Sequence, residues 1–178
     1  MGEFINYKIT TSDAILEKAF VIARREGIDA LTIRKLATEC GIAVGSVYNY
    51  FANKEAVVAA CRSLFWGEIL KDQEKLVRPG MGFTDFLTQY YSFMAIRLAQ
   101  DDNSWLRVMD QSTMRSVQKL FSEVLANDSR INGSIWNLEL TPDNFVEHVR
   151  ANLLALLQAG ERDCRFYIFL LEHLLYER

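Results

Sequence analysis

The side chains best suited to polar recognition lie together in residues 45–50, which read GSVYNY. An amide flanked by two phenols closes this segment: Tyr48, Asn49 and Tyr50. The phenols carry hydroxyl groups on rigid stems, and the amide offers a donor and an acceptor side by side. Val47 and Phe51 are one helical turn apart, so they are expected to share a core face. The three polar residues cannot all share that face, and we expect some of them to meet another molecule.

The elements that would position this segment are helices joined by short turns. Apolar residues at helical spacing predict four helices, over about 12–26, 33–40, 43–51 and 53–75. Gly27 and Gly41 are expected to end the first two. Two short helices that are joined by a tight turn and packed on a longer first helix form helix-turn-helix geometry.

In this geometry the outer helix enters the DNA major groove by its N-terminal end. The predicted contacts lie along that helix and at two other helix starts: Thr32, Val44, Gly45, Ser46, Tyr48, Asn49, Tyr50 and Lys54. The hydroxyl groups suit phosphate oxygens, and helix starts favour anions because their N–H groups are free. Asn49 suits an adenine edge, and Val44 a thymine methyl group. The alternative is a small helical bundle whose tyrosines pack on the rest of the protein.

The segment ALTIRKLATECGIAVGSVYNYFANKEAVV resembles the DNA-binding domain of the TetR (tetracycline-repressor) family of bacterial transcriptional regulators. The similarity covers about residues 11–65. It consists of a first helix ending at Gly27 and of four short motifs: Thr32-Ile33-Arg34-x-Leu36-Ala37, Gly41-Ile42, Val47-Tyr48-x-Tyr50-Phe51 and Asn53-Lys54-Glu55.

The resemblance implies two groups of DNA contacts. The first group, implied to bind phosphates, is Thr32, Arg34, Tyr48 and Lys54. The second, at positions where the family reads bases or the adjacent backbone, is Gly45, Ser46, Asn49 and Tyr50. Two residues depart from the family pattern. Ala43 stands where a capping serine is frequent, and Val44 stands where a polar or basic residue is common.

The whole chain is predicted to be all-α, with two domains. A three-helix DNA-binding domain is expected over 9–53 and a helical ligand-binding and dimerisation domain over 54–178, connected by the helix over 54–75. Further helices are expected in the second domain over about 83–100, 105–109, 112–127, 142–158 and 164–176.

The middle helices of the second domain hold many aromatic and methionine side chains, which cluster around a helix break at Gln100–Ser104. We expect them to line a pocket for an apolar or aromatic small molecule. The predicted ligand contacts are Trp66, Phe86, Tyr90, Met94, Trp105, Met109 and Phe121. Plain core packing is the alternative for each of them. The helix over 53–75 runs from the DNA-reading segment into this region, so a ligand wedged there is expected to move the reader.

The last helix is apolar on nearly every side and is expected to be buried on more than one side. A second copy would supply the missing cover, giving a four-helix dimer interface from 143–158 and 164–176. The predicted interface residues are Val149, Leu153, Leu156, Phe166, Leu170 and Leu174. Burial within the same chain is the alternative.

Other classes of function find little support in the sequence. No phosphate-binding glycine loop or nucleophile motif is present, so we expect no enzyme activity. His148 and His173 lie on separate predicted helices, and a metal site with Cys164 is the less favoured alternative to surface histidines, so no metal or cofactor is expected. The three isolated cysteines and the absence of a leader or membrane segment favour a cytoplasmic protein.

These patterns predict a dimeric transcriptional regulator, with a repressor favoured. It would bind a pseudo-palindromic double-stranded DNA operator and be released by a small-molecule effector. The alternative is a helical protein-protein interaction module without DNA binding.

Overall fold

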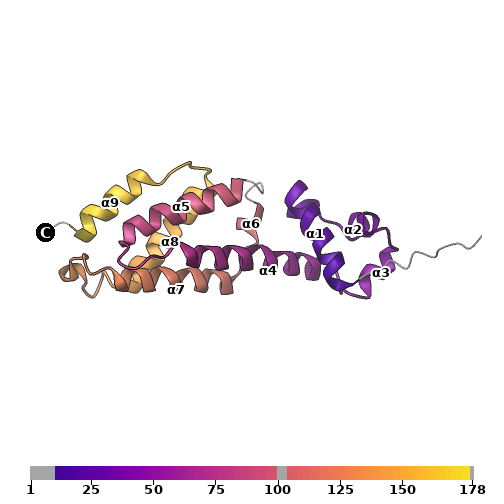
Figure 1. Ribbon diagram of the computed structural model, residues 1–178, viewed down its shortest axis with the longest axis horizontal. Coiled ribbons are helices and arrows are strands. Elements are labelled where there is room, and N and C mark those ends of the chain that lie inside the picture. The colour runs from indigo at the N-terminus through magenta and orange to yellow at the C-terminus, as the bar shows by residue number, and fades with distance from the viewer. Residues whose placement is uncertain (1–10, 100–103, 177–178) are drawn as a thin grey trace, which may run out of the picture. The chain divides into compact units, whose positions relative to one another are not determined.

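The computed structural model describes residues 11–99 and 104–176, and every regular element within these ranges is a helix. The chain divides into two compact units, Met1–Leu64 and Phe65–Arg178. The helix α4 (Lys54–Gln73) begins in the first unit and continues in the second (Figure 1). The all-α prediction is confirmed, and the predicted domain boundary after residue 53 stays a prediction.

The first unit contains three helices before α4, namely α1 (Ser12–Glu26), α2 (Ile33–Cys40) and α3 (Val44–Tyr48), with a short 3-10 turn, η1 (Ile28–Ala30), after α1. Each of the longer helices starts at a side chain that accepts a hydrogen bond from a backbone N–H three residues on: Thr11 from Ala14, Thr32 from Lys35 and Asn53 from Ala56. Such caps satisfy N–H groups that the helix itself leaves unpaired.

The turn between α2 and α3 is set by Gly41. Its φ of 65° lies in the left-handed region, which glycine enters without steric cost. The N–H of Gly41 donates to the carbonyl of Thr38, and the N–H of Ile42 donates to the carbonyl of Ala37. This pair of hydrogen bonds is a Schellman motif, which ends α2 sharply and redirects the chain into α3.

A single apolar core holds α1, α2, α3 and the start of α4 together. Its buried residues include Ile15, Ala19, Ile22, Leu36, Val47, Phe51, Val57 and Cys61. The helix α3 ends at Tyr48, three residues earlier than predicted. Val47 and Phe51 nevertheless share the core. The N–H groups of Tyr50 and Phe51 both donate to the Val47 carbonyl, and this hydrogen-bonded turn continues the helical path of the chain as far as Phe51.

The described residues of the second unit form the rest of α4 and five further helices, with two 3-10 turns, η2 (Glu74–Leu76) and η3 (Gly133–Ile135). The helices are α5 (Phe83–Ala99), α6 (Ser104–Arg107), α7 (Gln111–Asn127), α8 (Pro142–Gln158) and α9 (Arg165–Tyr176). In Figure 1, α9 lies along α5, and α7 packs against α8. The predicted break at Gln100–Ser104 lies outside the described residues except for Ser104.

One buried carboxylate ties three parts of the second unit together. Asp128, just after α7, accepts hydrogen bonds of 2.7 Å from the Phe83 N–H at the start of α5 and of 2.7 Å from the Tyr176 hydroxyl at the end of α9. Arg130 adds an ion pair at 3.1 Å. Burial acts to raise the Asp128 pKa, but the hydrogen bonds from Arg130, Tyr176 and the Phe83 backbone outweigh it and lower the pKa to about 2.

None of the three cysteines, all of which lie within the described residues, forms a disulfide bond. Cys61 is buried in the first unit and Cys164 in the second, whereas Cys40 is partly exposed. Burial raises the pKa of Cys61 to about 12 and that of Cys164 to about 11. Within residues 11–99 and 104–176, no group of three or more His, Cys, Asp or Glu side chains could hold a metal ion, and no helix is both long and apolar enough to cross a membrane.

Candidate nucleic-acid interface and ligand cavity

The helix α3 presents its predicted DNA contacts to solvent. Tyr48 and Tyr50 are 52% and 44% exposed, Val44 is 40% exposed, and Asn49 is exposed as well. Gly45 also faces solvent, and a Cβ atom placed there would meet no atom within 4 Å. The packing against the rest of the unit therefore does not require these side chains, which disfavours the alternative in which the tyrosines pack inside the bundle.

Three predicted phosphate contacts lie on neighbouring turns of the first unit. Thr32 accepts the Lys35 N–H at 3.2 Å, which leaves its own O–H free to donate to a phosphate. Lys54 is the first residue of α4, and its ammonium lies 3.4 Å from the carbonyl oxygen of Asp29. The ammonium keeps further N–H donors for an anion. Arg34 is exposed on the first turn of α2.

Some cations of the first unit form ion pairs, whereas Arg34 and Lys54, among the described residues, do not. Arg25 pairs with Glu26 and Glu39, and Lys35 pairs with Glu26. Within the described part of the chain, neither Arg34 nor Lys54 forms an ion pair. Arg34 and Lys54, two of the predicted phosphate contacts, therefore keep a positive charge that no ion pair within these residues offsets and that can attract an anion. Ser46, the remaining predicted contact, is half-buried on α3.

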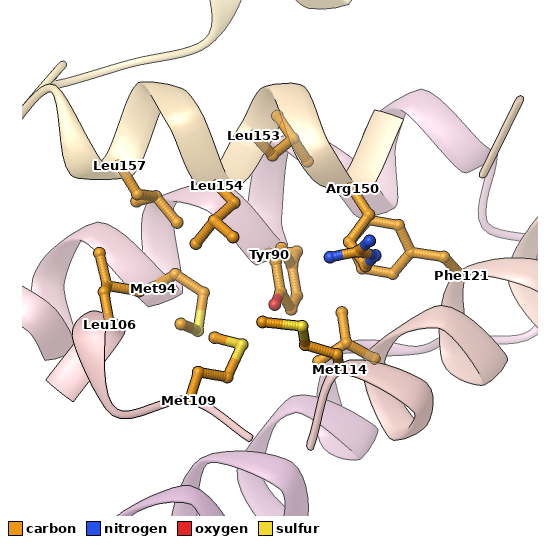
Figure 2. A pocket seen from close by; sticks show the side chains of 11 residues that line it. Tyr90, Met94, Leu106, Met109, Met114, Phe121, Arg150, Leu153, Leu154 and Leu157 are labelled. Carbon is orange, nitrogen blue, oxygen red and sulfur yellow. The ribbon is translucent and has the colours of Figure 1, made fainter. Parts of the chain in front are cut away.

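The second unit contains a narrow cavity of about 20 Å³ between α5, α7 and α8. Figure 2 shows its lining, which is mostly apolar and rich in methionine: Tyr90, Met94, Leu106, Met109, Met114, Val117, Phe121, Arg150, Leu153, Leu154 and Leu157. In this state it has room for about one water molecule. A larger guest therefore requires side chains to move, and unbranched methionines adapt readily.

Four of the seven predicted ligand contacts line this cavity, namely Tyr90, Met94, Met109 and Phe121. The other three are packed elsewhere in the core. Trp105 stacks on Phe65 at 4.4 Å between ring centroids, and Trp66 meets the same ring edge-on at 5.3 Å. Phe86 is fully buried behind the lining, where it packs edge-on against Phe121. For these three residues the alternative of plain core packing fits their positions.

Sequence reasoning missed the charged member of the lining, Arg150. Arg150 occupies a position on α8 in line with Val146, Leu153 and Leu157, at helical spacing. An arginine inside an apolar stripe was a usable signal, because a cation on a core face needs a reason to be there. The apolar lining residues outside the predicted ligand set are Leu106, Met114, Val117, Leu153, Leu154 and Leu157.

The predicted dimer residues fall into two groups. Val149 and Leu153 on α8 are 0% and 1% exposed within their own unit, so they have no surface left for a second copy, and this part of the prediction is wrong. Leu156 is half-buried. On α9 the predicted residues Phe166, Leu170 and Leu174 are exposed, together with Phe169, and follow helical spacing along one side. The opposite side of α9 packs inward through Ile168, Leu171 and Leu175.

A short outer helix with exposed polar side chains, set by a glycine turn and followed by a separate helical unit, defines a helix-turn-helix DNA-binding fold of the kind found in bacterial transcriptional regulators. Residues 15–61 match the sequence model described as "Bacterial regulatory proteins, tetR family". This match confirms the predicted resemblance to the TetR family over these residues.

Solved structures extend this likeness to the fold of the whole chain. The fatty acid degradation regulator FadR from Bacillus halodurans is similar with a TM-score of 0.64 at 17% identity, covering 92% of this chain and 94% of that chain. Reduced E. coli NemR gives a TM-score of 0.64 at 16% identity, over 93% and 97%. A TetR variant from Acinetobacter baumannii AYE in complex with minocycline gives 0.60 at 16% identity, over 93% and 94%. No curated protein sequence matches.

Proposed function

We propose that this protein is a transcriptional repressor that binds a pseudo-palindromic operator as a homodimer and releases it when a small molecule occupies the second unit. The observation that carries the proposal is the surface of α3. Its tyrosines and asparagine are exposed beside two cations that lack ion-pair partners within the described residues, on a domain of a DNA-binding family. The predicted contacts Thr32, Arg34, Val44, Gly45, Ser46, Tyr48, Asn49, Tyr50 and Lys54 form the proposed interface.

Dimerisation is supported by the exposed side of α9. Four large apolar side chains on one stripe of a helix are costly to leave in water, at about 25 cal/mol for each Å² of apolar surface. A second copy would cover the same stripe on both protomers, because a two-fold interface uses one surface twice. The dimer would present two copies of α3 to half-sites about 34 Å apart or a multiple of that distance.

Release by a ligand is supported by the cavity and by α4. The cavity is apolar with few polar groups, as small-molecule sites are. The helix α4 is continuous between the two units. A regulator with the same fold carries minocycline in its solved structure. Because coupling between two sites is reciprocal, a ligand that weakens DNA binding must itself bind less tightly to the DNA-bound protein.

The test of DNA binding is a mobility-shift and footprinting experiment on the DNA that flanks the gene. We expect protection of a palindrome. Lys54→Ala should weaken binding to every sequence and reduce the salt slope by about one unit for each bound protomer, since one phosphate contact is lost. Asn49→Ala should relax preference at one base pair, at a cost of about 1–3 kcal/mol.

Lys18→Ala is the matched control, because Lys18 is an exposed lysine on α1 outside the proposed interface. It should leave both affinity and salt slope unchanged. If Asn49→Ala loses affinity equally on operator and random DNA, the asparagine does not read a base. If the protein protects no DNA at all, the helical protein-protein interaction module becomes the better description.

A further inference from the structure

The cavity in the second unit has one cationic wall in an otherwise apolar lining. Arg150 is half-buried on α8, and its Nε donates a hydrogen bond of 3.3 Å to the amide oxygen of Gln118 on α7. That amide is neutral, and within the described residues Arg150 forms no ion pair. A half-buried guanidinium loses part of its hydration, and one hydrogen bond to a neutral amide replaces only some of that loss.

A second polar group faces the same space. The Tyr90 ring lines the cavity beside Arg150, and Figure 2 shows its hydroxyl oxygen directed among the methionine side chains. Burial raises the Tyr90 pKa, while the Arg150 charge acts to lower it, which reflects how near the two groups lie. Among the described residues the Tyr90 hydroxyl has no hydrogen-bond partner. The cavity lining therefore holds both a cation and a neutral O–H donor.

An open groove on the outer side of Arg150 continues this arrangement. Gln111, Met114, Arg115, Gln118, Lys119 and Arg150 line it. Met114 and Arg150 belong to the groove and to the cavity, so the two spaces share a wall. Of the six described residues that line the groove, three are cations and none is a carboxylate. Lys119 forms only an exposed pair with Glu123, at 3.7 Å.

We propose that the effector is an anionic amphiphile, whose carboxylate or phosphate group binds Arg150 and the Tyr90 hydroxyl while its apolar chain enters among Met94, Met109 and Met114. Only the regulatory role of this ligand rests on the proposed function, because its binding can be measured without DNA. The charged end suits the guanidinium, whose fork of N–H donors matches carboxylate and phosphate oxygens. The apolar end displaces flexible methionine side chains and thereby enlarges a cavity that now holds about one water.

The test compares three probes that share a ten-carbon chain, used below their micellar concentrations: decanoate, decyl phosphate and 1-decanol. Binding to the wild-type protein without DNA is followed by titration calorimetry. We expect at least one of the two anions to bind about 10- to 100-fold more tightly than the alcohol, since charge-assisted hydrogen bonds contribute that ratio. The stronger of the two anions then identifies the headgroup as carboxylate or phosphate.

Arg150→Met removes the charge and keeps an unbranched apolar stem. In this variant the preference for the anion over 1-decanol should fall to within about threefold, with the melting temperature of the unliganded protein near that of wild type. Arg150→Gln serves as a second variant that retains a polar end, in case the first does not fold. Arg78→Gln is the matched control, because Arg78 is an exposed arginine of the same unit that lines neither space, and it should keep the wild-type preference.

Three results would overturn the proposal: equal binding of the alcohol and both anions to wild type, an anion preference that survives loss of Arg150, or no binding of any probe up to its solubility limit. A mobility-shift measurement without probe is run in parallel. Intact DNA binding with no anion preference rejects this inference and leaves the regulator proposal standing. An Arg150-dependent anion preference without DNA binding supports this inference and rejects the regulator proposal.

Discussion

Replacing Asp128 by alanine is expected to be among the most destabilising single changes in the second unit. The carboxylate lies at the N-terminus of α5, where it accepts the Phe83 N–H at 2.7 Å and complements the positive end of the helix dipole. Its side chain is only 2% exposed. It also accepts the Tyr176 hydroxyl and the Arg130 backbone N–H, so it joins α5, the chain after α7 and the end of α9.

The magnitude can be reached by two routes. Alanine leaves the buried Phe83 N–H and the partly buried Tyr176 hydroxyl without this acceptor, and each donor that loses its partner costs about 1–3 kcal/mol, so the sum is about 2–6 kcal/mol. Independently, a carboxylate pKa lowered from 3.8 to about 2 corresponds to about 2–3 kcal/mol of interaction with the ionised form. We therefore expect Asp128→Ala to reduce the free energy of unfolding by about 3 kcal/mol.

The assay is urea unfolding at one fixed protein concentration, with Glu147→Ala as the control. Glu147 is exposed on α8, and its loss should change the free energy of unfolding by less than about 0.5 kcal/mol. The pH dependence follows from the lowered pKa. Between pH 4 and 2 the unfolded state binds the proton more readily than the folded state, so stability rises with pH in this window. The contribution of Asp128 is complete above about pH 5 and disappears as the pH falls through about 2.

The difference in unfolding free energy between wild type and Asp128→Asn should accordingly be constant from pH 7 to 5 and shrink from pH 4 downward. A loss below about 0.5 kcal/mol for Asp128→Ala would refute the reasoning. So would a difference between wild type and Asp128→Asn that does not change as the pH falls to 2.

Two further changes test the core and the proposed dimer. Phe86→Ala should cost about 3–5 kcal/mol in urea unfolding, because the ring is fully buried against Phe121 and its removal leaves a cavity, while Phe93→Ala, at a half-buried position on the same helix, should cost less. Leu170→Glu should convert the dimer into monomer in sedimentation, whereas Ile96→Glu, at an exposed apolar position on α5, should leave it dimeric. A wild-type protein that sediments as a monomer at micromolar concentration would contradict the proposed dimer.

Features that depend on a few neighbouring residues could be predicted from the sequence. The caps Thr11, Thr32 and Asn53 and the stop at Gly41 form hydrogen bonds within about five residues, so residue type alone announces them. The end of α3 is harder to predict from the sequence. The spacing of Val47 and Phe51 predicts one continuous helix. In the structure the helix ends at Tyr48, and a turn in which the N–H groups of Tyr50 and Phe51 both donate to the Val47 carbonyl gives the same spacing.

Features that depend on packing between distant helices could be predicted only in part. Tyr90 and Met94 share a face of α5, which periodicity reveals, but only the packing of α7 and α8 determines that Met114 and Arg150 meet them. Val149 and Leu153 were assigned to a dimer interface because an apolar stripe does not say which neighbour covers it. In the folded unit that neighbour is the protein's own core.

The buried thiols of Cys61 and Cys164 can each serve as a probe of local unfolding in the unit that contains it. A buried thiol whose pKa is raised to about 12 or about 11 carries almost no thiolate at neutral pH, and the thiolate is the form that an alkylating reagent attacks. Modification of either residue therefore waits for a local unfolding event, and its rate measures how often that event occurs. Since Cys61 lies in the first unit and Cys164 in the second, mass spectrometry of the labelled peptides can follow the two units separately. The same time course can then show whether a ligand in the cavity of the second unit lowers the rate of local unfolding in the first unit.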